Sequence, residues 1–99
     1  MSTHVLLHLN LLSTPDAART TLYELLEAKQ WFKVHPSFTA WRCKYKDDVE
    51  NVPAEVVREI KQLALKAGVP KLYGVAQCGN SVAFDFEYDA TPKLYLKRT

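Results

Sequence analysis

Four polar side chains in two alternating stretches of the sequence have the chemistry to contact a phosphate or another polar partner. Arg42 and Lys44 alternate with core-type residues in one stretch, and His8 and Asn10 alternate with leucines in another. Arginine and lysine bind phosphate oxygens, and histidine and asparagine supply further hydrogen bonds. We therefore predict that His8, Asn10, Arg42 and Lys44 bind nucleic acid or a partner. The competing interpretation is that all four are simply solvated strand residues.

Metal or covalent chemistry has less support in the residue pattern. His4 and His8 are four residues apart on a predicted strand, so they lie about 13 Å apart at roughly 3.3 Å per residue, too far to chelate one ion. Cys43 and Cys78 are predicted to be reduced, partly buried thiols, because two cysteines are too few for a disulfide scaffold. No serine or cysteine is accompanied by a recognisable base and orienting group. The sequence predicts no metal site and no cofactor, and it leaves any catalytic residue unknown.

The composition limits the class of protein that can position these residues. The chain has 99 residues, 47% of them hydrophobic and 24% charged, which is enough for one folded domain over residues 1–99. A net charge of +2 is not that of a strongly basic nucleic-acid coat. No apolar run approaches the roughly 20 residues of a membrane-spanning helix, and no secretory signal is visible. We therefore expect a cytoplasmic protein with no membrane partner.

Hydrophobic periodicity predicts the elements of the first two thirds of the chain. Residues 5–12 alternate as a central strand, and a helix with a hydroxyl cap follows to about residue 29. Residues 30–35 and 38–46 are predicted to form a hairpin with a longer second arm. A second helix opens at Pro53 and ends at Gly68.

The last third is predicted to be a hairpin of residues 71–78 and 81–88. The linking pair, Gly79-Asn80, is typical of a tight two-residue turn. A turn of this length fixes which residues of the two strands oppose each other. In that register the core face holds Tyr73, Val75, Val82, Phe84, Phe86 and Tyr88, while Gly74 and Ala76 lie on the opposite face.

The order β-α-β-β-α-β-β predicts an α+β fold, a ferredoxin-like βαββαβ sandwich with an extra C-terminal β-hairpin strand. Both helices would cover one face of an antiparallel sheet and leave the other face bare. A bare face that carries leucines and positive charge is typical of a partner-binding surface. We expect a homodimer that contacts RNA, DNA or a protein partner. Residues 89–99 are expected to be an extension or a strand exchanged in a dimer.

Residues 5–88 resemble the small CRISPR-associated endoribonuclease and integration-subunit family and its GhoS-like antitoxin relatives. The similarity lies in the amphipathic first helix, the pair Trp31-Phe32, the strand with Trp41, and the second helix opening near Pro53. The resemblance implies a ferredoxin-like homodimer that pairs through its sheets, often with C-terminal strands added across the interface. Metal-dependent members carry an aspartate at the end of the first strand, where this chain has Asn10. The resemblance therefore favours binding or assembly over metal-dependent cleavage.

The strand order is also similar to that of RNA-recognition domains. Residues 6–11 resemble their first-strand motif, but the base-stacking aromatic of that motif is missing. In the predicted strand of residues 38–46, alternation turns Trp41 and Tyr45 inward. Phe38 is then the only aromatic residue of that strand that points outward. We interpret this similarity as a consequence of the shared strand order.

Other functions remain open on the sequence. One is a small ribonuclease of the resembled family that uses His8 or His35 as acid and base. A second is a small-molecule enzyme with a pocket between sheet and helices. A third is a protein-interaction factor, such as an antitoxin or a phage-encoded inhibitor.

Overall fold

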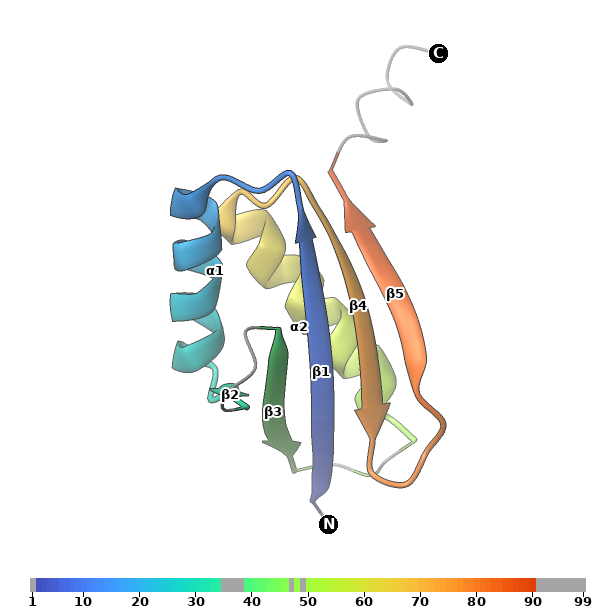
Figure 1. The fold of residues 1–99 in the computed structure, drawn as a ribbon. Helices are drawn as coiled ribbons and strands as arrows, with labels where there is room; N and C mark the ends of the chain where they lie inside the picture. Colours follow the sequence, from blue (N-terminus) through green and yellow to red (C-terminus); the bar gives the residue numbers. More distant parts are fainter. Residues whose placement is uncertain (1, 35–38, 47, 49, 91–99) are drawn as a thin grey trace, which may run out of the picture.

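The computed structural model describes residues 2–34, 39–46, 48 and 50–90, in which five strands and two helices follow one another along the chain. The elements are β1 (Thr3–Leu12), α1 (Asp16–Ala28), β2 (Phe32–Lys33), β3 (Ala40–Tyr45), α2 (Val52–Ala67), β4 (Lys71–Cys78) and β5 (Phe84–Asp89). The strands form one sheet in the order β2-β3-β1-β4-β5, with every neighbouring pair antiparallel. Both helices lie on the same side of this sheet (Figure 1).

This arrangement confirms the predicted α+β fold and is consistent with a ferredoxin-like sandwich. β1 is central, and β5 extends the four-stranded core of the fold as a hairpin partner of β4. Neither helix of the described residues is long and apolar enough to cross a membrane. The expected exchanged or extending segment lies mostly outside the described residues, since β5 ends at Asp89 and residues 91–99 are not among them.

The alternation along β1 separates a buried face from an open one, as predicted. Val5, Leu7 and Leu9 are buried, whereas Leu6 and His8 between them are exposed. β1 has partners on both sides, β3 and β4, so its backbone groups are paired along most of its length. A strand in this position fixes the direction of every side chain that it carries.

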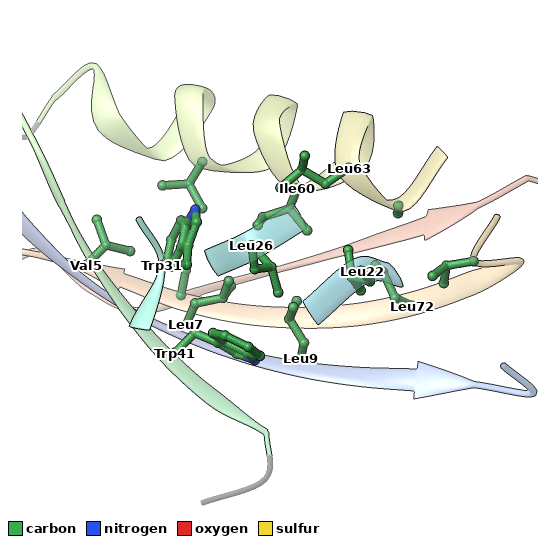
Figure 2. Packing of buried hydrophobic residues seen from close by; sticks show 14 of the residues in the cluster. Val5, Leu7, Leu9, Leu22, Leu26, Trp31, Trp41, Ile60, Leu63 and Leu72 are labelled. Carbon is green, nitrogen blue, oxygen red and sulfur yellow. The ribbon is translucent and has the colours of Figure 1, made fainter. Parts of the chain in front are cut away.

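The helices cover the buried face with aliphatic side chains. Leu22 and Leu26 of α1 and Ile60 and Leu63 of α2 point toward Leu7, Leu9 and Trp41 on the strands (Figure 2). α2 ends as predicted at Gly68, which adopts the left-handed conformation (φ 78°) that glycine takes at little cost.

The predicted hydroxyl cap of α1 is wrong. The helix begins at Asp16 after Pro15, and no side chain caps it. The hydroxyl of Thr14 instead donates to the carbonyl of Leu12, and Ser13 has φ 51°. The hydroxyl of Thr14 therefore bonds to the end of the strand and not to the helix.

The predicted register of the last hairpin is wrong by one residue. Gly74 pairs with Phe86 and Val75 with Asp85, because the strands are joined by residues 79–83 and not by a two-residue turn. A slip of one residue moves every side chain of a strand to the other face. The core side of β4 therefore carries Leu72, Gly74, Ala76 and Cys78, while Tyr73 and Val75 lie on the open face and Val82 is 89% exposed in the loop.

Gly74 has a packing role that this register explains. A Cβ at this position would lie 2.7 Å from Cε1 of Phe86, because the phenylalanine ring covers the glycine across the strand pair. Phe84, Phe86 and Tyr88 pack against the core from β5, as predicted for these three residues. The glycine thus provides the space that one of these rings fills.

A buried aromatic cluster ties β2 and β3 to α2. The indole Nε1 of Trp31 donates to Oε1 of Glu59 over 2.7 Å, and the hydroxyl of Tyr45 donates to the same oxygen over 3.0 Å. Trp31 is fully buried, and its ring meets that of Tyr45 edge-on at 6.1 Å between centroids. One carboxylate therefore accepts hydrogen bonds from the residue that precedes β2 and from the last residue of β3.

Candidate binding surface on the open sheet face

One face of the sheet points away from both helices and is covered by neither of them (Figure 1). Among the described residues, five of the seven exposed large hydrophobic side chains lie on this face, and the other two are Leu65 of α2 and Val82 of the loop. Such a concentration is typical of interaction surfaces. We call this surface the open face, and its side chains are His4, Leu6, His8, Asn10, Leu12, Phe32, Arg42, Lys44, Lys71, Tyr73, Val75, Gln77, Asp85, Glu87 and Asp89.

The β2–β3 side of the open face is cationic and hollowed. Arg42 and Lys44 are exposed on β3, two residues apart and on the same face. They line a depression of about 520 Å³ together with Leu6, Phe32 and His4. None of the described residues that line this depression is acidic. The hollow therefore offers positive charge and apolar surface side by side.

The β5 side of the open face is acidic. Asp85 and Glu87 are exposed, and the hydroxyl of Tyr73 donates a hydrogen bond to Oδ2 of Asp85. This hydrogen bond, with the charge of Asp85, raises the pKa of Tyr73 above its usual value. At the far end of the strand pair, Nζ of Lys71 lies 3.7 Å from Oδ2 of Asp89. The open face thus carries opposite charges on its two sides.

The structure brings together only part of the site predicted from the sequence. Arg42 and Lys44 share the depression, as their alternation implied. His8 lies farther along β1, between Ala40 and Val75, and Asn10 lies beside Tyr73. All four predicted residues are exposed on the open face, but His8 and Asn10 do not line the depression.

Sequence reasoning missed Phe32, His4 and Tyr73 as parts of this surface. Phe32 lies on a strand of only two residues, too short for alternation to be read. His4 shares a face with His8, and that shared face was visible in the sequence. Tyr73 was assigned to the core through the incorrect hairpin register. The alternation of Tyr73 and Val75 with the smaller Gly74 and Ala76 gave no independent indication of which face was inside.

Neither cysteine has the environment of a reactive thiol. Both are free; Cys78 is buried and Cys43 is half-buried. Burial raises the pKa of both thiols, which disfavours the nucleophilic thiolate. The described residues contain no group of three or more histidine, cysteine or acidic side chains that could hold a metal ion.

A second hollow, of about 930 Å³, lies on the other side of β5 against α2. Its apolar residues include Leu65 and Phe84, but its charges are mixed, because Arg58, Lys61, Glu87 and Asp89 all line it. Because charges of both signs line this hollow, its lining favours neither an anionic nor a cationic ligand. The depression on the open face is therefore the more selective of the two.

The fold and the open face together define a class, a small ferredoxin-like α+β sandwich with one uncovered sheet face. Comparison of the chain with protein-family models, curated proteins and solved structures gives no match. The resemblance to the CRISPR-associated family stays a hypothesis from the sequence.

Proposed function

We propose that this protein is a small cytoplasmic binding module that contacts nucleic acid through the cationic side of its open face. One observation carries the proposal: Arg42 and Lys44 flank an apolar depression whose described lining contains no acid. Cations next to an aromatic ring form the usual surface for a nucleic-acid strand. The two free cysteines, one of them buried, are compatible with a reducing compartment.

The acids of β5 limit the footprint of the bound strand. Asp85 and Glu87 repel phosphates, so the strand follows β3 and β1 and does not cross the whole sheet. In this arrangement Arg42 and Lys44 contact phosphates, and His8 and Asn10 supply hydrogen bonds farther along β1.

The double variant Arg42→Ala/Lys44→Ala tests this function. We expect weaker binding of a short fluorescent RNA or DNA, and a salt dependence of the association constant that is shallower by about 1.4 in log–log slope, as for two lost phosphate contacts to a single strand. Fluorescence anisotropy between 50 and 200 mM salt, roughly the range in which such contacts are most visible, measures both quantities. The matched control is Lys61→Ala/Lys66→Ala, which removes two exposed charges from α2.

The control pair is expected to bind with the slope of the wild-type protein. Equal losses in the two double variants would show that net charge, and not the open face, controls binding. Unchanged binding in Arg42→Ala/Lys44→Ala would exclude these residues as phosphate contacts and favour a protein partner, such as the target of an antitoxin or inhibitor.

A second candidate function is assembly of two copies through the open face. The observation that favours it is the separation of charge, because a twofold axis parallel to the central strands would place β3 of one copy over β5 of the other. In the observed register Arg42 of one copy would lie two residues, about 7 Å along the strands, from the level of Asp85 of the partner copy. The contact would centre on residues that include Leu6 and Val75.

This assembly predicts a particle of two chains that dissociates as salt is raised. Sedimentation equilibrium at low and high ionic strength measures the mass directly. Two chains per particle at every salt concentration would indicate another interface, and one chain throughout would leave the face free for nucleic acid.

The ribonuclease alternative has less support on the open face. The cross-strand neighbours of His8 are Ala40 and Val75, neither of which can act as a second acid or base. His35, the other predicted acid–base residue, lies outside the described residues.

A further inference from the structure

We propose that the depression on the open face is a subsite for one unpaired base of a single-stranded nucleic acid. The base stacks on Phe32, and Arg42 and Lys44 hold the phosphates on either side of it. This inference rests on the proposed function and names the form of nucleic acid that the face prefers.

Phe32 is held on the open face by the residues on both sides of it. Trp31 is fully buried and hydrogen-bonded to Glu59 on the helix side. Lys33 also points to the helix side, where its Nζ lies 4.6 Å from the ring centroid of Tyr23. Because side chains alternate along an extended chain, Phe32 must point the other way. Its side chain is 58% exposed even though its backbone is paired with β3.

The neighbours of Phe32 suit a flat base whose nucleotide carries a negative phosphate. Phe32 pairs with Arg42 across the β2–β3 ladder, and Arg42 pairs with Leu6 across the β3–β1 ladder. Paired residues on one face have Cβ atoms about 5 Å apart, so the aromatic ring, the guanidinium and the leucine form one row. A base on Phe32 therefore lies directly beside a cation.

The hollow has the size and the polar groups that such a ligand needs. Its volume of about 520 Å³ lies within the roughly 300–1,000 Å³ of typical small-ligand sites. Lys44 lies two residues from Arg42 on the same face, a spacing of about 7 Å. The two cations can therefore contact neighbouring phosphates. His4 and Gln77 line the hollow and supply hydrogen-bonding groups for the edge of the base.

Only an unpaired base can use this subsite. In a duplex the bases are stacked inside the helix, and their faces are not available to a protein side chain, whereas single strands stack readily on aromatic residues. The acidic β5 side also opposes the second strand of a duplex. The subsite therefore selects single strands, with one base per copy of this chain.

The test compares four probes of equal length and label by fluorescence anisotropy. They are a single-stranded RNA, the DNA of the same sequence, the corresponding duplex, and a DNA with abasic positions that keeps the phosphates. The wild-type protein is expected to bind both single strands more tightly than the duplex and the abasic strand. Phe32→Ala is expected to lose at least about fivefold in affinity for the base-bearing single strands, as for one lost base stack, and to bind the abasic strand as before.

Two further variants keep the result interpretable. Phe32→Trp preserves the stacking surface and is expected to retain the preference for single strands. Leu65→Ala removes a side chain of similar exposure, 62%, from α2 and is expected to bind like the wild-type protein. Circular dichroism and thermal unfolding of each variant check that the fold is intact.

The outcomes separate this inference from the function on which it rests. If Phe32→Ala binds every probe normally while Arg42→Ala/Lys44→Ala loses affinity, the face binds nucleic acid but the base subsite is wrong. Duplex binding as tight as single-strand binding would also overturn the subsite. If the wild-type protein binds no probe in a salt-dependent manner, the proposed function itself fails. A difference between the RNA and DNA arms identifies which sugar the face accepts.

Discussion

Leu7→Ala is expected to lower the free energy of unfolding by about 2–5 kcal/mol, whereas Leu6→Ala, one residue away, is expected to cost less than about 1 kcal/mol. Leu7 is fully buried between the central strand and the helices, so its truncation leaves a cavity. Leu6 is 44% exposed on the open face. Urea unfolding followed by tryptophan fluorescence measures both changes.

The same pair of variants reports on assembly through the open face. If two copies pair there, the cost of Leu6→Ala rises with protein concentration and the unfolding midpoint of the wild-type protein depends on concentration. For Leu7→Ala, the intrinsic loss of about 2–5 kcal/mol remains at any concentration. Equal costs for the two variants in dilute, single-chain protein would contradict the division of β1 into a buried and an open face.

Glu59→Leu is expected to be the most damaging change of a charged residue on α2. It removes the acceptor of both the Trp31 indole and the Tyr45 hydroxyl. A buried donor without an acceptor costs about 1–3 kcal/mol, and Trp31, fully buried, has no access to water. Thermal and urea unfolding of Glu59→Leu measure the loss.

Matched variants identify the cause of that loss. Glu59→Gln keeps an acceptor oxygen and is expected to lose less, while Glu24→Leu removes an exposed carboxylate of α1 and is expected to change little. A loss in Glu59→Gln as large as in Glu59→Leu would show that the charge of Glu59, and not its acceptor oxygen, stabilises the cluster.

The alkaline pH dependence of stability gives a second readout of the same contact. Burial, and then the charge of Glu59, raise the pKa of Tyr45 above its usual value. A tyrosine in the unfolded chain releases its proton near pH 10, roughly its ordinary pKa. The folded state retains that proton, so stability is full below about pH 10 and falls as the pH rises further. Tyr45→Phe should flatten this fall, which pH-dependent urea unfolding measures.

The sequence was sufficient where one face of an element is clearly apolar. The alternation of β1, the aliphatic stripe of α2 and its glycine stop at Gly68 all predicted the elements that the structure contains. These signals are strong because burial and backbone geometry agree at each position. The order of the elements then led to the correct sheet topology.

The sequence was insufficient where both faces of a strand carry apolar residues. In β4, Tyr73 and Val75 on one face are as hydrophobic as Leu72 and Ala76 on the other, so the register depended wholly on the assumed turn length. That one assumption moved Tyr73 from the open face to the core. The role of Phe32 was also hidden, because it depends on what Trp31 and Lys33 contact in three dimensions.

The separation of cations and acids across the open face has a consequence for encounter with a charged molecule. β3 and β5 are three strand spacings apart, about 14 Å, which exceeds the Debye length of about 8 Å at physiological salt. At that salt the acids of β5 do not cancel the attraction of Arg42 and Lys44, and the two sides act independently. In dilute buffer the two sides act together as a dipole that turns the molecule as it approaches, so that β3 meets an anion first.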